Sequence, residues 1–425
     1  MPSPTTRRDF LKSTASAAAA ASILAAAPAV HASSSDELKV GLIGCGGRGT
    51  GAAVNALRAG SGIKLWAMGD LFMDQVQASR GRLKGELADQ VDVSDDRCFA
   101  GFDNYQKVLD SGVNVVLLAS PPGFRPTHIK AAVDKGVHIF AEKPVAVDGP
   151  GVRAVMAACE EAKKKNLVLV SGLCFRYDLP KRETMARVHD GAIGDITAIH
   201  CSYNTGLLWR KDRKPDWTDM EWQCRNWLYF AWLSGDHNVE QHIHNLDKAA
   251  WAMKDQYPVK AVGLGGRQVR TAPEWGHIFD HHAVVYEYAN GQKCFSFCRQ
   301  QSGVANEVSD FLYGTKGVCE VMKHKITGEK PWAYRTRRQD RKGDMYQQEH
   351  DELFAAIRSG KPINNGDYMC KSTLMAIMGR MATYTGQVIT WDMALNSQEN
   401  LMPEKLEMGT LAMPPVAQPG VTKFV

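Results

Sequence analysis

The feature that most constrains the fold is an apolar run that ends in a cluster of glycines, residues 40–49 with the sequence VGLIGCGGRG. Gly44, Gly46 and Gly49 occupy the three glycine places of a G-x-G-x-x-G pattern. A strand that turns through such a loop into a helix lets the backbone approach a pyrophosphate, which then faces the helix N-terminus. The pattern alone is weak, because glycine-rich turns are common, so the residues around it decide how it is interpreted.

The residues after the loop favour a dinucleotide site over a glycine turn in some other α/β protein. A helical stretch is followed by a second apolar strand, Ile63–Met68, and Asp70 stands 21 residues after Gly49. An acidic residue at about that distance is the part of the fingerprint that binds the adenosine ribose. Because no arginine directly follows Asp70, we predict NAD as the cofactor in preference to NADP. The expected cofactor-binding loop also includes Cys45, Gly47 and Arg48.

Hydrophobic periodicity predicts two differently built parts. Up to about Gly172 apolar strands alternate with helices of 9 to 17 residues, which predicts a doubly wound parallel sheet, the Rossmann arrangement. After Asp195 the apolar runs alternate and are separated by turns such as Asn290-Gly291, which predicts a mostly antiparallel second sheet. We therefore expect an α/β chain with a Rossmann domain at 36–172 and a second α/β domain with a large open sheet at 173–395. An irregular tail should follow at 396–425.

The first residues predict export. Thr6-Arg7-Arg8-Asp9-Phe10-Leu11-Lys12 is a twin-arginine signature, and an alanine-rich stretch follows that is too short to span a membrane. We expect a signal peptide at 1–32, cleavage after Ala32 and no membrane anchor after processing. Twin-arginine export carries folded proteins, so we expect a cofactor seated before export to stay bound and to be regenerated within each catalytic cycle.

The charge of the chain is modest, with a formal net charge of +5. The basic residues are spread along the sequence, which argues against a nucleic-acid partner. We expect a small-molecule partner instead.

Lys143 is a candidate catalytic residue. It lies in Ala141-Glu142-Lys143-Pro144, directly after the strand expected at His138–Ala141. Ligands bind at the carboxyl ends of parallel strands, so a lysine at this place can reach a substrate hydroxyl group. A surface lysine beside a glutamate is the open alternative.

A histidine-rich segment, residues 236–247, supplies further candidates. If it is helical, Glu240, His244 and Asp247 share one face, and a carboxylate could orient His244 as a general acid or base. Packed or solvated histidines are the alternative. A metal site built from His237, His242 and His244 is also conceivable, but His242 and His244 would point to different faces, so we predict none.

Tryptophans are dense between residues 209 and 232, where five of the ten occur. Flat aromatic faces pack against the C–H faces of sugar rings, although most of these side chains are expected in a core or a subunit contact.

Taken together, these motifs resemble the glucose–fructose oxidoreductase, inositol dehydrogenase and MocA family over nearly all of the chain after the signal segment. The resemblance rests on the glycine loop with Asp70, on Glu142-Lys143-Pro144 and on four further motifs. These are Ala119-Ser120-Pro121-Pro122 with His128, Gly172-Leu173-Cys174-Phe175-Arg176-Tyr177, His244-Asn245-Leu246-Asp247 and Glu349-His350-Asp351-Glu352-Leu353-Phe354.

The resemblance implies roles for individual residues. Lys143 would help to bind and activate the substrate hydroxyl, and His244 would be the acid–base residue. Family dehydrogenases commonly carry Asp four residues before that histidine, where this chain has Glu240, and a small residue where it has His242. Ser120, Pro121, His128 and Glu142 would join the cofactor site. Arg176, Tyr177, Trp227 and His242 are candidates for substrate binding.

Three functions follow from the sequence. The first is an NAD-dependent oxidoreductase that acts on a carbohydrate or polyol, as a homo-oligomer joined through the second sheet. The second is a redox-neutral glycoside hydrolase or lyase that uses the same bound cofactor, since some family members are NAD-dependent glycosidases. The third is a sugar-binding paralogue without catalysis, against which the presence of Lys143 and His244 argues.

Overall fold

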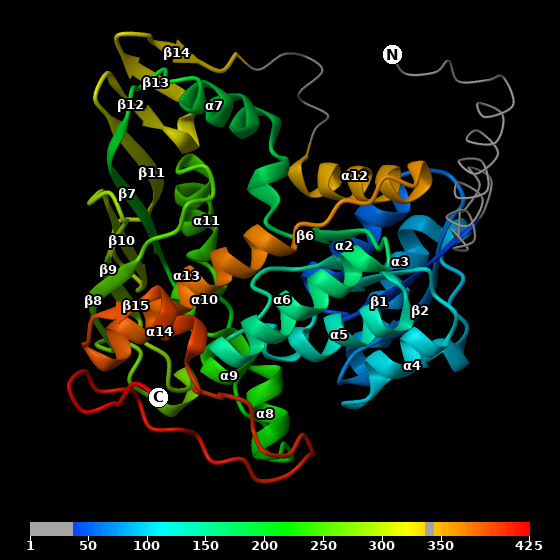
Figure 1. The fold of residues 1–425 in the computed structure, drawn as a ribbon. Helices are drawn as coiled ribbons and strands as arrows, with labels where there is room; N and C mark the ends of the chain where they lie inside the picture. The colour runs from blue at the N-terminus through cyan, green and yellow to red at the C-terminus, as the bar shows by residue number, and fades with distance from the viewer. Residues whose placement is uncertain (1–36, 336–343) are drawn as a thin grey trace, which may run out of the picture. The chain divides into compact units, whose positions relative to one another are not determined.

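The computed structural model describes residues 37–335 and 344–425. The predicted signal peptide at 1–32 lies outside the described residues. The first half of the chain forms a six-stranded parallel sheet in the order β3-β2-β1-β4-β5-β6 (Figure 1). Its strands are β1 (Leu38–Ile43), β2 (Ile63–Gly69), β3 (Cys98–Phe99), β4 (Val115–Leu118), β5 (His138–Ala141) and β6 (Leu169–Ser171).

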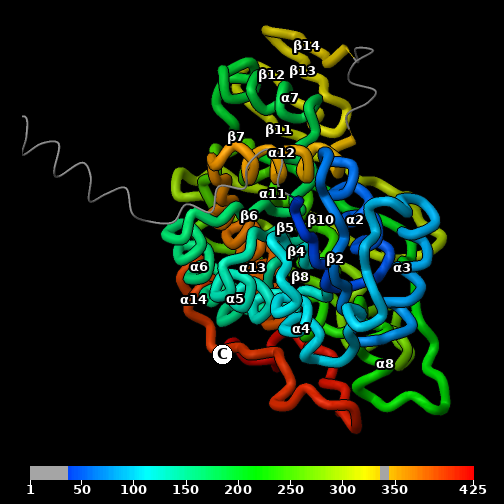
Figure 2. The backbone as a smooth tube through the Cα atoms, turned by 90° about the vertical axis from the view of Figure 1, so that its right-hand side faces the viewer, coloured from blue at the N-terminus to red at the C-terminus, as the bar shows by residue number. Residues whose placement is uncertain are grey.

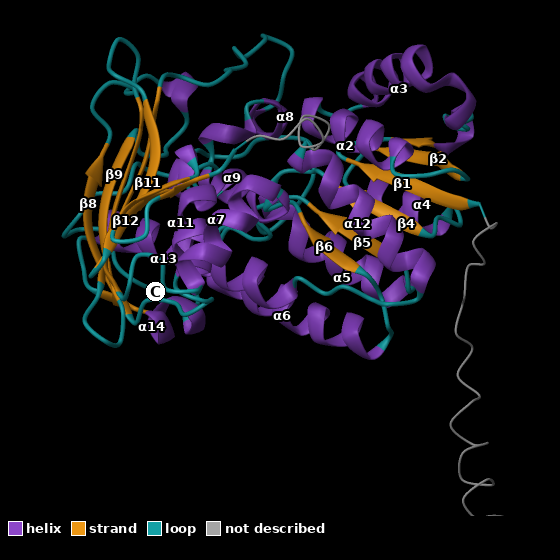
Figure 3. Ribbon diagram, turned by 90° about the horizontal axis from the view of Figure 1, so that it is seen from above, coloured by secondary structure: helices purple, strands orange, loops and turns teal. Residues whose placement is uncertain are grey.

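Helices cover both faces of this sheet. α2 and α3 lie on one side, and α5 and α6 lie on the other (Figure 3). Parallel strands need such crossovers, because a tight turn cannot join them. The helices of this half are α2 (Gly47–Arg58), α3 (Met73–Leu87), α4 (Asn104–Asp110), α5 (Arg125–Lys135) and α6 (Gly149–Lys164), and α7 (Leu179–His189) leads to the second half.

The second half contains a nine-stranded sheet in the order β14-β13-β12-β11-β7-β10-β9-β8-β15. Its neighbouring strands are antiparallel except for β7 and β10, which run parallel. Its strands are β7 (Ile196–Thr205), β8 (Lys260–Gly266), β9 (His281–Glu287), β10 (Lys293–Gln300), β11 (Glu307–Gly314), β12 (Gly317–Glu320), β13 (Lys325–Gly328), β14 (Trp332–Ala333) and β15 (Ile389–Thr390). The two sheets confirm the predicted fold class, whereas the exact domain boundaries stay a prediction.

The remaining helices pack between the sheets or beside them. They are α8 (Asp219–Arg225), α9 (Ala231–Ser234), α10 (His237–Glu240), α11 (Ile243–Ala252), α12 (Met345–Ser359), α13 (Gly366–Thr385) and α14 (Trp391–Asn396). α12 returns to the first half and lies beside α2 (Figure 2), where the amide of Gln347 donates to the Asn55 carbonyl at 2.9 Å. From Ser397 on the chain has neither helix nor strand.

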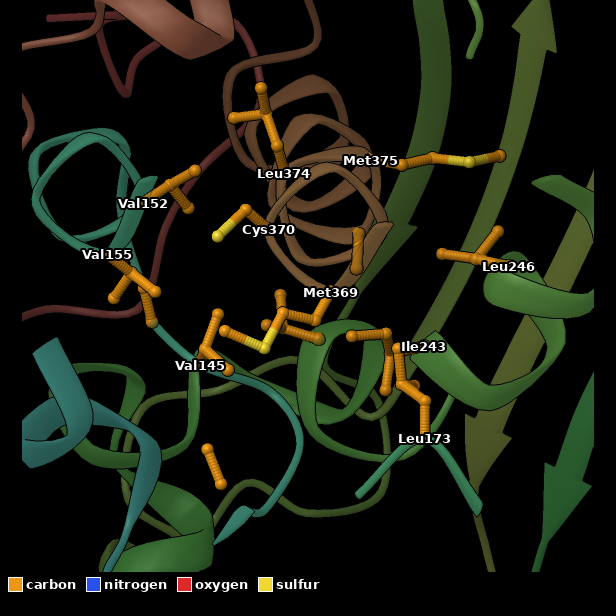
Figure 4. Packing of buried hydrophobic residues seen from close by; sticks show 14 of the residues in the cluster. Val145, Val152, Val155, Leu173, Ile243, Leu246, Met369, Cys370, Leu374 and Met375 are labelled. Carbon is orange, nitrogen blue, oxygen red and sulfur yellow. The ribbon is translucent and has the colours of Figure 1, made fainter. Parts of the chain in front are cut away.

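α13 is the centre of the main hydrophobic core. Met369 and Cys370 contribute to the side of this core where Val145 and Val152 of the first half lie, while Ile243 and Leu246 of α11 line the opposite side (Figure 4). Nearly every residue of α13 is buried, which explains why the helix lacks a polar face. This shared core fixes the carboxyl end of the first sheet against α10 and α11.

Candidate functional site

The glycine loop has the geometry that a pyrophosphate needs. Gly44 has φ +95°, and a Cβ there would lie 2.4 Å from the Ser120 nitrogen; a Cβ at Gly49 would lie 1.8 Å from the Gly44 carbonyl oxygen. A Cβ at Gly46 or Gly47 would meet no atom within 4 Å, so the start of α2 is open on that side. The residues therefore fit a dinucleotide whose phosphates approach the N-terminus of α2.

Asp70 directly follows β2, and its carboxylate contacts the glycine loop. Its carboxylate accepts hydrogen bonds from the Cys45 N–H at 2.7 Å and from the Phe72 N–H at 3.1 Å. Burial raises the pKa of Asp70, while these two N–H groups act in the opposite direction. The carboxylate is thus held beside the loop, where an adenosine ribose would meet it.

Ser120 and His128 support the loop that follows β4. The Ser120 hydroxyl lies 3.0 Å from His128 Nδ1, and the buried His128 ring stacks on Tyr105 with 4.5 Å between centroids. Burial, with a smaller effect of the Arg125 charge, lowers the pKa of His128 to about 3. His128 therefore holds Ser120 in place as a neutral ring. Pro121 precedes the short turn η3 (Pro122–Phe124) at the same edge of the sheet.

Arg48, expected to face the cofactor, turns toward two carboxylates. Its Nε lies 2.5 Å from Glu142 Oε1, and its terminal nitrogen lies 3.7 Å from Glu349 Oε1 on α12. The other Glu142 oxygen accepts the Lys143 N–H at 3.2 Å. Glu349 is fully buried, and burial together with Glu142 raises its pKa. Glu349 belongs to a sequence motif, but nothing in that motif indicates that it faces Arg48 and Glu142.

Lys143 lies at the carboxyl end of the first sheet and contacts the second half. Its Nζ lies 2.8 Å from Glu240 Oε1 and also donates to the Glu240 carbonyl oxygen. Both side chains are largely buried, so the ion pair is shielded from solvent. The arrangement holds the ammonium group in one position.

His244 lies close to this pair. Burial, with the charges of Lys143 and Lys248, lowers its pKa well below 6.5. The ring packs edge-on against Phe175 at 5.2 Å between centroids, and its buried Nδ1 has no hydrogen-bond partner in the described residues. At neutral pH the ring is uncharged and can accept a proton.

The predicted common helix face of Glu240, His244 and Asp247 is not formed, because the segment breaks into α10 and α11 between Glu240 and Ile243. Asp247 is buried and accepts hydrogen bonds from Arg176, at 2.9 to 3.1 Å, and from the Ser372 hydroxyl at 2.8 Å. Within residues 37–335 and 344–425 no hydrogen bond joins Asp247 to His244. Asp247 therefore holds Arg176, while Glu240 holds Lys143.

Three of the expected substrate-binding residues have structural partners. Arg176 is buried between Asp247 and Asp255, and the Tyr177 hydroxyl donates to the Asn365 side chain at 2.7 Å. His242 faces the second sheet, fully buried, with its Nε2 at 2.6 Å from the Ser296 hydroxyl. Their role in substrate binding stays a prediction. Trp227 remains partly exposed and packs edge-on against Trp209 at 5.8 Å.

Tyr203 and Gln241 are neighbours of the site that sequence reasoning missed. The Tyr203 hydroxyl donates to Gln241 Oε1 at 3.0 Å. Burial, with the Glu240 charge, raises the pKa of Tyr203 to about 12. Tyr203 lies in one of the alternating runs after Asp195, and such a run does not show what the side chain faces.

In the described part of the chain no three His, Cys, Asp or Glu residues come together as a metal-binding group. His237 and His242 are buried among protein neighbours. Among the described helices, none has the length and apolar character that crossing a bilayer requires.

Comparison with known proteins identifies two segments. Residues 38–172 match the oxidoreductase family with an NAD-binding Rossmann fold known as GFO_IDH_MocA, and residues 4–23 match the twin-arginine translocation signal. The chain therefore carries an NAD-binding oxidoreductase domain and an export signal.

Two dehydrogenases are similar in sequence. The chain is 29% identical to inositol 2-dehydrogenase 4 of Saccharopolyspora erythraea over 40% of its own length and 46% of the relative. It is 25% identical to inositol 2-dehydrogenase of Azotobacter vinelandii over 60% of its length and 65% of the relative. The matched region thus spans less than two thirds of either relative.

Solved structures share the fold over a larger part. The scyllo-inositol dehydrogenase of Lactobacillus casei with NAD(H) and scyllo-inositol superimposes with a TM-score of 0.64 at 18% identity, covering 84% of this chain and 99% of that one. The aldose-aldose oxidoreductase of Caulobacter crescentus complexed with glycerol gives a TM-score of 0.65 at 17% identity, with 83% and 99% covered. At these identities the likeness concerns the fold.

Proposed function

Residues 38–172 of this chain belong to the Gfo/Idh/MocA oxidoreductase family, and from this premise we propose that the enzyme oxidises a secondary hydroxyl group of a carbohydrate or polyol. Bound NAD supplies the hydride acceptor. The observation that carries the proposal is the Lys143–Glu240 ion pair with the neutral His244 beside it, at the edge of the sheet where the nicotinamide half would lie. The sequence relatives named inositol 2-dehydrogenase support a polyol as substrate class.

The residues divide the chemistry between them. Lys143 donates a hydrogen bond to the substrate oxygen, and Glu240 keeps the ammonium group oriented. His244 accepts the hydroxyl proton while the hydride leaves the same carbon, so a ketone forms and both electrons go to the cofactor. Gly44–Gly49 would hold the pyrophosphate and Asp70 the adenosine ribose, while Ser120, fixed by His128, lies on the neighbouring loop after β4.

A redox-neutral glycoside hydrolase or lyase is the second candidate, and the export signal favours it. An exported enzyme has no large nicotinamide pool with which to exchange. Oxidation of one ring carbon acidifies the neighbouring C–H, whose proton His244 could remove so that the glycosidic oxygen leaves. Addition of water and return of the hydride would complete hydrolysis with no net reduction.

Purified protein tests both candidates. Heat release and chromatography should show NAD in protein to which no nucleotide was added. Mixing with polyols and aldoses should then produce up to one equivalent of reduced nicotinamide absorbance per active site with a true substrate, and none in the Lys143→Ala variant. Release of an aryl aglycone without net reduction of the nicotinamide cofactor would support the glycosidase. Protein that neither holds nor binds NAD would exclude both.

The outer face of the second sheet supports assembly into a homo-oligomer. One cross-strand row runs through Val262, Val285, Phe295, His200 and Phe311, on five adjacent strands. On the same face Leu264 is 68% exposed, and Phe295 and Phe297 are each 38% exposed. An apolar face of this size on a folded chain marks an interaction surface, and a second copy is the occupant that we propose.

A further inference from the structure

A second hydrophobic core lies apart from the main one and joins three distant parts of the chain. We call the segment 217–234, which contains α8, the turn η5 (Trp227–Tyr229) and α9, the aromatic cap. Its buried side chains include Trp222, Tyr229, Phe230 and Trp232. Two other groups pack on it: first-half residues Leu71, Phe72, Phe102 and Phe124, and tail residues Leu401, Met402 and Leu411.

The first-half residues in this core mark its position on the Rossmann sheet. Leu71 and Phe72 directly follow Asp70 at the end of β2, and Phe124 belongs to the turn after β4. A dinucleotide bound on the glycine loop and Asp70 places its adenosine half at the ends of these strands. The core therefore adjoins the adenosine end of the site.

Two contacts of Arg225 join α8 to the adenosine end of the site. The guanidinium group of Arg225 lies 3.8 Å from the Phe72 ring centroid and 3.0 Å from the Asp74 carboxylate at the start of α3. Burial raises the pKa of the Cys224 thiol, and the charge of Asp70 adds to this effect.

The tail crosses from the first half to the aromatic cap. The Leu401 N–H donates to Asp148 at the start of α6, at 3.0 Å. Ten residues later, the Leu411 N–H donates to Asp219 at 3.2 Å, and its carbonyl accepts the Gln223 amide at 2.9 Å. The tail is thus held at both ends, across the junction of the cap with the first half.

Gly123 shows how closely these parts approach. A Cβ at this position would lie 2.1 Å from the Trp232 carbonyl oxygen and 3.2 Å from Met402 Sδ. The turn after β4 is therefore covered directly by both α9 and the tail, with no room for a side chain between them.

We propose that the aromatic cap and residues 401–411 form the outer wall of the adenosine end of the NAD site and slow release of the cofactor. The inference rests on the cofactor site of the proposed function. The wall consists of segments outside the Rossmann domain, so dissociation requires that the cap or the tail first separate from Phe72 and Phe124. Such a wall suits an enzyme that is exported with its cofactor bound.

The test measures NADH dissociation by stopped-flow, with excess NAD as competitor and nicotinamide fluorescence as the signal. The double variant Met402→Ala/Leu411→Ala should release NADH at least about 10-fold faster, because it removes the apolar contacts of the tail. Met413→Ala is the matched control, since this methionine follows the 401–411 segment in the same tail and is 40% exposed. Its rate should equal that of the unchanged protein.

Arg225→Met, which removes the ion pair with Asp74, gives an independent measurement if the double variant does not fold, and it should also accelerate release. Equal dissociation rates in Met402→Ala/Leu411→Ala, Arg225→Met and the unchanged protein would overturn the wall. Absence of any NADH binding in the unchanged protein would instead overturn the cofactor assignment on which the wall depends.

Discussion

The Nζ of Lys143 lies 2.8 Å from Glu240 Oε1, although 97 residues separate the two in sequence. The contact joins the turn after β5 to α10 and so brings the proposed cofactor-binding and acid–base residues to one place. A buried ion pair also requires both partners, because removal of one leaves the other charge without compensation.

Glu240→Gln should therefore lower turnover by about 10²-fold, within the range of general acid–base contributions, while NAD affinity stays within about twofold. Glu240→Asp should retain more activity, because it keeps the charge with a shorter reach. Turnover and NAD titration on the same preparations check both expectations. Wild-type turnover in Glu240→Gln would remove Glu240 from the site.

His244→Ala should lower turnover by about 10²- to 10⁴-fold with the fold and NAD binding intact. Because burial and the two lysines place the pKa of His244 well below 6.5, the ring stays neutral from pH 8 down to 6.5. Titration of His244 should therefore not change kcat/KM between pH 8 and 6.5. Protonation of the ring should lower kcat/KM only at a more acidic pH. The kcat/KM profile checks this. His189→Gln, on α7, serves as the histidine control.

The parallel sheet, the glycine loop and the position of Lys143 could be predicted from the sequence, because each depends on a local feature: periodicity, glycines and a strand end. The segment that contains α10 and α11 is held by distant residues, at Asp236 before α10 and at His242 between the two helices. Asp236 accepts hydrogen bonds from the Phe279 N–H and the Tyr384 hydroxyl, and His242 bonds to Ser296. Helical spacing carries no information on such contacts.

The same reason explains why the sequence did not show the partners of the predicted substrate-binding residues. Arg176 and Tyr177 belong to a motif near the site, but the first is surrounded by Asp247 and Asp255 and the second bonds to Asn365. A motif indicates that a group of residues lies near a functional site, but it does not show how each side chain is oriented. Which of them face a ligand depends on partners that arrive from α11 and α13.

Acid should destabilise the protein in part through His128. Its pKa is about 3 in the folded state and 6.5 ordinarily, so its stabilising contribution is complete above pH 6.5 and is lost as the pH falls toward 3. At pH 5 the loss is about 2 kcal/mol. Urea unfolding measures the free energy of unfolding at pH 7.5 and at pH 5.0. The decrease between the two pH values should be smaller in His128→Gln than in the unchanged protein, by about 2 kcal/mol. An equal pH effect in both proteins would contradict the expectation.

Asp70→Asn should weaken NAD binding by about 10-fold or more, since a charge-assisted hydrogen bond to the ribose is lost. The unchanged protein should bind NADP more weakly than NAD, because a 2′-phosphate would face the carboxylate, and the variant should narrow this difference. Titration with both nucleotides measures the ratio. Asp92→Asn is the control, because the exposed carboxylate of Asp92 pairs with Arg97. Equal binding of NAD and NADP by the unchanged protein would refute the selectivity.

Phe295→Arg should dissociate the proposed oligomer. Phe295 lies in the middle of the five-strand apolar row, between Val285 on β9 and His200 on β7, so a charge there would be buried at any contact that covers this face. Light scattering with size-exclusion chromatography should show the unchanged protein as a multiple of the chain mass and the variant as smaller species. Leu406→Arg, at an exposed tail position, should leave the mass unchanged. An unchanged protein that is monomeric at high concentration would show that another molecule, or solvent, covers this face.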